Sequence, residues 1–339
     1  MRFPLIVLVI AAHSLTISNN IPSKECGWQA YYYITELLSH NLCKIAVCWF
    51  FVFSGYFFFY NLKEKSISRE WVLGKWKKRG YSLLVPYILW NVIAISAILI
   101  KSHITSKLGL GEDEQMAWIR SWRVFDWLLY STPDFPLWYM RDLMIMTLLA
   151  PISYYILRNK AAGLILIIAV YLLPVYPEIP GDRAICFFTL GAYLGIHKIN
   201  LLQICHKFKL TSYIIAPILL ILTTISTNTP YHNWLLRAFY PFGMVAAMNL
   251  IDRLIDNQRM KDTLFKMSSY VFFIYAAHEI YILQWTKGCL LRVFGNSLLG
   301  YSISYMLIPF LVTLICIFIY TLISKLAPRT LAVCCGKRI

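Results

Sequence analysis

The residues best suited to chemistry at the start of this 339-residue chain are an arginine and a histidine in the opening stretch MRFPLIVLVIAAHSL. Ten mostly apolar residues separate Arg2 from His13. In a helix the two side chains lie on one face, about 20° apart around the axis and roughly 16 Å apart along it. A histidine can remove a proton from a hydroxyl, while a cation at the helix start can hold the anionic end of a substrate. The structural alternative is an arginine that anchors the helix and a histidine that hydrogen-bonds to a neighbouring helix.

A second group of polar residues lies in WYMRDL, where an arginine and an aspartate follow two aromatic rings. Arg141 and Asp142 are adjacent, so their side chains cannot face the same direction on a helix, and we expect each to need its own partner. Two roles remain open for them. They staple this helix to its neighbours, or they line an acceptor site together with Trp138 and Tyr139, whose rings suit the faces of sugars.

Two further apolar segments carry candidate residues. FFIYAAHEIYI contains His278 and Glu279, and the carboxylate either orients a histidine on another helix or pairs within the bundle. FFVFSGYFFF places Ser54 and Gly55 in an aromatic-rich helix, where small residues let another helix approach closely. Because Ser54 lacks a GxSxG context, we do not assign it as a nucleophile.

The composition places these residues in a membrane protein. The chain is 59% hydrophobic and only 14% charged, which is too apolar for a soluble globular protein of this length. Lys and Arg number 32 against 16 Asp and Glu, but no nucleic-acid-binding or Gly-rich phosphate-loop motif accompanies them. We therefore attribute the basic excess to membrane topology and expect no nucleic-acid partner. The nine cysteines include no CxxC or Cys/His ligand spacing, so we expect neither a metal site nor a disulfide framework.

We expect an all-α, polytopic membrane bundle of about ten transmembrane helices, formed by a single integral membrane domain over residues 1–339. This follows because about ten apolar segments are long enough, or nearly so, to cross a bilayer core of roughly 30 Å. They lie near residues 3 to 18, 42 to 61, 81 to 101, 137 to 156, 161 to 177, 183 to 198, 210 to 227, 235 to 251, 268 to 286 and 301 to 324. Most Lys and Arg residues fall after the even-numbered segments and in the C-terminal tail, which predicts that both termini are cytoplasmic.

The densest basic run, KEKSISREWVLGKWKKRG, lies between the second and third segments. It contains Lys77, Lys78 and Arg79 at its end. Such a run anchors the protein at an anionic membrane leaflet, or it offers a cytoplasmic platform for a phosphorylated substrate. The run itself does not choose between these two roles.

Six segments in the same order resemble the acyltransferase 3 family of integral membrane acyltransferases, whose members often O-acetylate surface polysaccharides. They are the Arg2 to His13 spacing, FFVFSGYFF, KKRGYSLLVPYILWN, PLWYMRDLMIM, FFTLGAYLG and YVFFIYAAHEIYI. The resemblance covers nearly the whole chain and is to family members without a fused SGNH domain. The family usually has several residues before the arginine, so we expect either a short start or residues missing upstream of Met1.

The resemblance implies roles for several of the basic residues. His13 corresponds to the essential histidine and Arg2 to its functional partner, with an acyl-CoA, acetyl-CoA above all, as the donor that enters from the cytoplasm. Arg79 corresponds to a basic residue that helps hold the donor phosphates, together with its neighbours Lys77 and Lys78. No permanently bound cofactor is implied.

The implied reaction is acyl transfer to a hydroxyl of a cell-surface carbohydrate, or of its lipid-linked precursor, in the bacterial cytoplasmic (inner) membrane. Ser54, Gly55 and Trp138 match family signature positions whose roles the resemblance does not specify. We expect His13 to act as the general base that takes the hydroxyl proton. A transient acyl-histidine is the second mechanism that fits, because imidazole is also a nucleophile.

Two other functions remain open. A transporter of a small molecule or lipid-linked sugar would use His13, Arg141 and Glu279 to line its pathway, but such proteins more often show internal repeats or broken helices at matched positions, and none is evident. A structural membrane subunit would explain the composition but not the polar residues in the apolar segments.

Overall fold

The computed structural model is entirely helical in the part of the chain that it describes, which comprises residues 1–15, 25–62, 67–108, 126, 129–130, 132–173 and 179–336. In chain order the helices are α1 (Arg2–Ala12), α2 (Cys26–Thr35), η1 (Glu36–Asn41), η2 (Leu42–Lys44), α3 (Ile45–Phe59), α4 (Arg69–Arg79), η3 (Gly80–Leu84), α5 (Val85–Lys107), η4 (Phe135–Leu137), α8 (Trp138–Leu157), α9 (Lys160–Leu172), α10 (Asp182–Ile196), α11 (Leu201–Lys207), α12 (Lys209–Ile225), α13 (His232–Ile255), α14 (Gln258–Met267), α15 (Val271–Ala277), η5 (His278–Ile282), α16 (Leu283–Phe294), α17 (Leu298–Leu326) and α18 (Pro328–Cys334). The expected all-helical class is confirmed.

Five continuous helical stretches among the described residues are long and apolar enough to cross a membrane. They are Cys26–Phe59, Arg69–Lys107, Phe135–Leu157, His232–Ile255 and Leu298–Leu326. The number rises to six if α10 and α11, which are bent by 107° relative to each other, together form one broken span. A polytopic helical membrane protein is therefore confirmed, but the expected ten spans are not, and the cytoplasmic termini stay a prediction.

The count differs because apolar segments alone do not show where helices join, shorten or break. The helices α1, α9 and α12 are apolar but too short to count as spans. The expected segments 3 to 18 and 161 to 177 also run past the described residues. The segment expected at 268 to 286 is divided into α15, η5 and α16.

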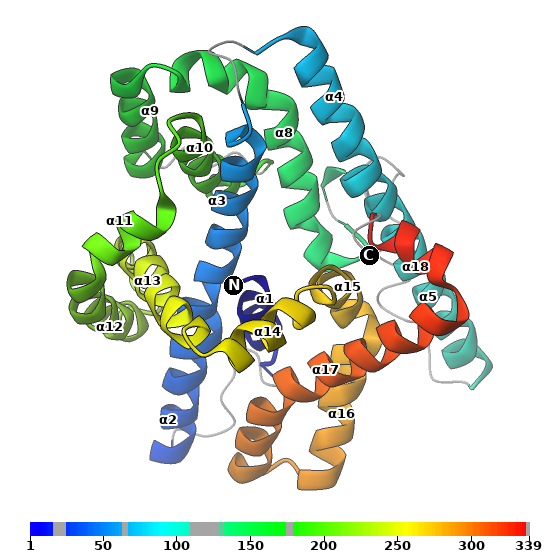
Figure 1. Ribbon diagram of the computed structural model, residues 1–339. Coiled ribbons are helices and arrows are strands. Elements are labelled where there is room, and N and C mark those ends of the chain that lie inside the picture. Colours follow the sequence, from blue (N-terminus) through cyan, green and yellow to red (C-terminus); the bar gives the residue numbers. More distant parts are fainter. Residues whose placement is uncertain are drawn as a thin grey trace.

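Helix α1 lies near the middle of the bundle, where Figure 1 shows it among α3, α15 and α17. Its side chains Leu5, Ile6 and Ile10 are fully buried. The helix ends at Ala12, earlier than expected, and the Ser39 hydroxyl of η1 donates a hydrogen bond to the carbonyl of Ala11 in its last turn. This contact holds the end of α1, so the residue that follows, His13, has a defined position.

The close packing of α3 against α10 rests on small residues, as the FFVFSGYFFF segment predicted for Gly55. A Cβ atom at Gly55 would meet the backbone carbonyl of Phe188, and one at Gly191 would meet that of Val52. Glycine at these two positions lets the helix backbones touch, which is how membrane helices gain packing energy without a hydrophobic driving force. The contact fixes α3, and with it the wall of the bundle beside α1.

Candidate active site

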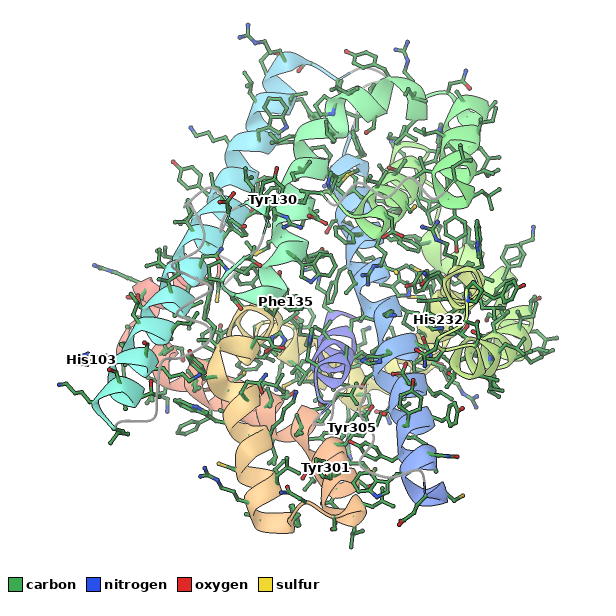
Figure 2. The ribbon with its side chains drawn as sticks, turned by 180° about the vertical axis from the view of Figure 1, so that it is seen from behind. His103, Tyr130, Phe135, His232, Tyr301 and Tyr305 are labelled. Atoms are coloured by element: carbon green, nitrogen blue, oxygen red, sulfur yellow. The ribbon has the colours of Figure 1, made fainter. Side chains whose placement is uncertain are left out.

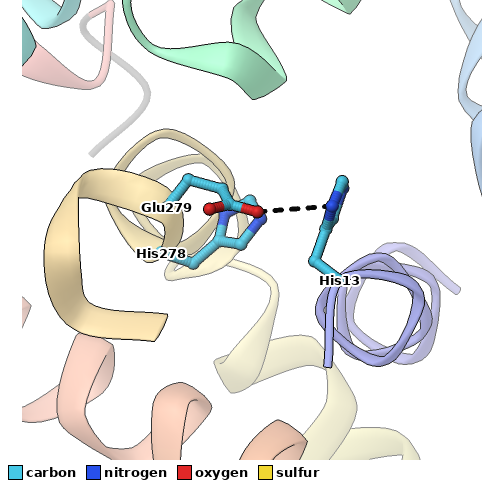
Figure 3. A group of neighbouring side chains, drawn as sticks. All are labelled: His13, His278 and Glu279. Carbon is cyan, nitrogen blue, oxygen red and sulfur yellow. Dashed lines mark ion pairs between the residues drawn. The ribbon is translucent and has the colours of Figure 1, made fainter. Parts of the chain in front are cut away.

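Three polar side chains from two distant parts of the chain meet beside the end of α1. His13 Nδ1 lies 3.3 Å from Glu279 Oε1, as Figure 3 shows. The rings of His13 and His278 are 5.7 Å apart between centroids. The side chains of His13 and Glu279 retain 27% and 16% of their surface exposed, whereas His278 is completely buried. The structure thus brings together three of the residues that the sequence singled out.

The tautomer of His278 follows from its hydrogen bonds. Its Nδ1 lies 3.0 Å from the carbonyl oxygen of Ile274 and 2.9 Å from that of Tyr275, so Nδ1 carries the proton and donates it. The other nitrogen, Nε2, is then a hydrogen-bond acceptor. It is buried and has no hydrogen-bond partner among the described residues.

The helix breaks directly after His278 and Glu279. His278 itself still has a helical backbone, with φ −63° and ψ −33°. The backbone leaves the helical conformation at Ile280 with ψ 79° and at Tyr281 with φ +60°. The break separates α15 from α16, and the two side chains that precede it both lie beside His13.

An aromatic residue and a buried carboxyl that the sequence did not single out complete this end of the site. The Phe135 ring meets the His13 ring edge-on at a centroid distance of 5.8 Å, and Figure 2 places Phe135 near the middle of the bundle. The preceding residue, Asp134, is buried, and neither of its carboxyl oxygens has a hydrogen-bond partner among the described residues. The positive charge of Lys287 acts on Glu279. Irregular segments carry no periodic signal, which is why sequence patterns missed Asp134 and Phe135.

Two cations approach each other at the other end of α1. Arg2 is exposed, Arg79 at the end of α4 is partly buried, and the positive charge of Arg2 acts on the Arg79 guanidinium. Neither forms an ion pair with a described residue. Lys77 and Lys78 are exposed on the same helical turn as Arg79. Cations that converge without carboxylate partners form a site suited to phosphate groups.

Aromatic contacts connect this basic end with the histidine end. Tyr139, which lies near Arg79, packs against Tyr275 at a ring centroid distance of 5.9 Å. The Tyr275 hydroxyl donates a 2.6 Å hydrogen bond to the carbonyl of Pro136, next to Phe135. A substrate lying along α1 would therefore pass over aromatic surfaces.

Ser54 and Trp138 have structural contacts near this path. The Ser54 hydroxyl lies 3.2 Å from that of Tyr139. Trp138 lies under the guanidinium of Arg183, 5.5 Å from its ring centroid.

The expectation that Arg141 and Asp142 need separate partners is wrong in one respect, because they also pair with each other. Arg141 Nη2 lies 2.9 Å from Asp142 Oδ1. The long arginine side chain can fold back along the helix, which overcomes the different directions of the two Cβ atoms. Arg141 also donates to the carbonyls of Leu129 and Tyr130, while Asp142 accepts from the amide of Gly181. These hydrogen bonds connect the start of α8 to the backbone of Leu129, Tyr130 and Gly181.

A comparison with known proteins shows the family to which the chain belongs. Residues 1–326 match the acyltransferase domain that defines the acyltransferase 3 family. The chain belongs to the acyltransferase 3 family. It is therefore a membrane acyltransferase, and the match spans both the Arg2 end of α1 and the histidine cluster at its other end.

One similar member of the acyltransferase 3 family is the succinoglycan biosynthesis protein ExoH of Rhizobium meliloti (strain 1021). It is 25% identical over 321 residues, which cover 90% of this chain and 82% of the relative. No solved structure matches the chain.

Proposed function

We propose that this protein is an integral membrane O-acyltransferase of the bacterial inner membrane that transfers an acyl group from acyl-CoA to a hydroxyl of a surface polysaccharide or its lipid-linked precursor. Acetyl is the expected acyl group. The observation that carries the proposal is the 3.3 Å approach of His13 Nδ1 to Glu279 Oε1 in a member of an acyltransferase family. The relative named for succinoglycan biosynthesis supports a polysaccharide acceptor.

In this proposal His13 is the general base. Its Nδ1–H donates to the Glu279 carboxylate, which holds the ring in one tautomer and leaves Nε2 free to accept a proton. The Nε2 lone pair takes the proton of the acceptor hydroxyl as its oxygen attacks the thioester carbonyl carbon. When the tetrahedral intermediate collapses, the C–S bond breaks and the CoA thiolate takes the proton from His13. Glu279 stabilises the imidazolium that exists between the two proton transfers.

Arg2 and Arg79, supported by Lys77 and Lys78, hold the phosphates of the donor in this proposal. The two arginines carry no described carboxylate partner and act on each other electrostatically. The pantetheine arm of CoA is a long flexible chain between the phosphates and the thioester. It suits a site in which the cations lie at one end of α1 and the histidine follows its other end.

The acceptor approaches from the side of the aromatic residues. Trp138 and Tyr139 at the start of α8 offer ring faces suited to sugars, and Phe135 packs directly on the His13 ring. Phe135 is 59% exposed and the His13 side chain keeps 27% of its surface exposed, so an incoming hydroxyl can reach the histidine beside Phe135.

The test is acyl transfer by membranes that carry either the wild type or His13→Ala, with labelled acetyl-CoA or succinyl-CoA and the surface glycans of the source organism. We expect label in the glycan with the wild type and none above background with His13→Ala. His206→Ala is the matched control, because His206 forms a similar pair with Asp252, at 2.8 Å, on other helices. Equal transfer by His13→Ala would refute the catalytic assignment. Uptake of an intact sugar without acyl transfer would favour a transporter.

A further inference from the structure

We propose that His13, His278 and Glu279 also bind a transition-metal ion, Zn²⁺, and that Zn²⁺ bound there reversibly stops acyl transfer. The metal binding rests on the geometry of the three side chains alone. Only its inhibitory effect rests on the proposed function.

The three residues present their ligand atoms close together. One nitrogen from each histidine and one carboxylate oxygen lie within 4.8 Å of one another. A tetrahedral zinc ion with bonds of about 2.0–2.2 Å separates neighbouring ligand atoms by about 3.4 Å. His13 Nδ1 and Glu279 Oε1, at 3.3 Å, already have this spacing. Rotation of the partly exposed His13 and Glu279 side chains closes the remaining distance to His278.

His278 has the hydrogen bonds of a metal-ligating histidine. Such histidines donate the hydrogen of one ring nitrogen to a carbonyl or carboxylate, which directs the lone pair of the other nitrogen toward the metal. Nδ1 of His278 donates to the carbonyls of Ile274 and Tyr275. Its Nε2 is buried without a hydrogen-bond partner among the described residues, so it is an acceptor that the protein fold leaves unused. Two histidines, one carboxylate and an open fourth position form the ligand set of catalytic zinc sites.

One nearby charge acts on the site. Lys287 acts on both Glu279 and His13, and its positive charge opposes a cation. Removing Lys287 should therefore strengthen zinc binding, whereas removing a ligand should weaken it.

Zinc at this position blocks the base. A neutral imidazole that binds Zn²⁺ through Nδ1 carries its remaining proton on Nε2. His13 in that form has no lone pair with which to accept the hydroxyl proton. Glu279 is also engaged by the metal, so it no longer orients the imidazole.

The test measures zinc on the purified full-length protein in detergent, after metal removal with EDTA and equilibrium dialysis against Zn²⁺ in excess Mg²⁺. We expect one zinc per chain by mass spectrometry of the metal. His278→Asn keeps an amide that can donate to the Ile274 carbonyl but removes Nε2. It should lower the zinc affinity by at least about 10–100-fold, since loss of even an outer hydrogen-bond partner costs this much. Lys287→Met should raise the affinity, and His206→Ala should leave it unchanged.

Two outcomes would overturn the proposed site. In one, His278→Asn binds zinc as tightly as the wild type; in the other, the wild type binds no zinc. If His278→Asn does not elute as a single folded species, Glu279→Gln removes a different ligand and serves the same comparison. A wild type that transfers acyl groups equally with saturating Zn²⁺ and with EDTA refutes the inhibition. A wild type that binds zinc but transfers no acyl group refutes the proposed function and its inhibition, while the metal site stands.

Discussion

His13 and Glu279 meet with Nδ1 and Oε1 3.3 Å apart, although one follows the first helix and the other lies in the break between α15 and α16. A histidine that activates a hydroxyl needs one ring nitrogen free to accept the proton and a carboxylate that holds the other nitrogen, and Glu279 provides the carboxylate. Each feature depends on a different residue. Substitutions at the two positions should therefore have different effects.

Replacing His13 should remove the base, whereas replacing Glu279 should only weaken it. We expect His13→Ala to lower kcat by about 10²–10⁴-fold, the usual contribution of general-base catalysis. Glu279→Gln retains an oxygen that accepts from Nδ1 but loses the charge that stabilises the imidazolium, so its kcat should fall less. Initial rates of transfer with labelled acyl-CoA measure kcat for both variants. An unchanged kcat in Glu279→Gln would show that the carboxylate does not act on His13.

Arg2 and Arg79 should affect donor binding rather than the chemical step. We expect Arg2→Ala and Arg79→Ala each to raise the KM for acyl-CoA by about 10–100-fold, because a hydrogen bond to a charged group contributes about 1.5–3 kcal/mol. The lysine variants should recover part of the affinity. Arg329→Ala is the control, because Arg329 is exposed on α18. Loss of kcat at unchanged KM would assign the arginines another role.

The α3 and α10 contact should tolerate no added methyl group. We expect Gly55→Ala to destabilise the protein by about 1–3 kcal/mol, the usual cost of overpacking, because its Cβ would meet the carbonyl of Phe188. Gly288→Ala in α16 has open space around the new Cβ and should stabilise the protein by about 0.4–1 kcal/mol. The melting temperatures of Gly55→Ala and Gly288→Ala in detergent, each compared with the wild type, measure these effects. A shift of the same sign in both variants would contradict the packing role of Gly55.

The Arg141 and Asp142 pair should matter for folding more than for chemistry. Its side chains are only 8% and 1% exposed, and removing one partner of a buried pair typically costs about 3–5 kcal/mol. We therefore expect Arg141→Ala to give little folded protein by size-exclusion chromatography. Replacing both residues by uncharged ones should recover part of the loss. Full yield of folded Arg141→Ala with no transfer would instead place the arginine in the acceptor site.

Ser54 should be dispensable for acyl transfer. Its hydroxyl makes a 3.2 Å hydrogen bond with Tyr139, and a bond of this kind contributes about 0.5–1.5 kcal/mol to stability. Ser54→Ala and Tyr139→Phe should each show a small fall in melting temperature. We expect Ser54→Ala to keep its kcat, and an acyl-serine in the wild type, sought by mass spectrometry, would contradict this.

The sequence predicted those features that follow from neighbouring residues alone, such as close helix approach at a glycine. The small residue Gly55 was correctly expected to permit close helix approach, because glycine has the same consequence in any membrane helix. The apolar segments predicted helices but not their ends. Helix α1 ends at Ala12, where Ser39 from η1 donates a hydrogen bond to the carbonyl of Ala11, and no pattern within the first segment contains that contact.

The sequence by itself determined that this is a helical membrane protein of the acyltransferase 3 family with Arg2 and His13 as candidate residues, because composition, apolar length and motif spacing are properties of the linear chain. Only the tertiary structure decided which polar groups meet. Glu279 and His278 reach His13 because α1 packs against α15. Arg141 folds back on Asp142 because the bundle buries both. Such convergence depends on how distant helices pack and where they break, and spacing along the sequence does not encode these distances.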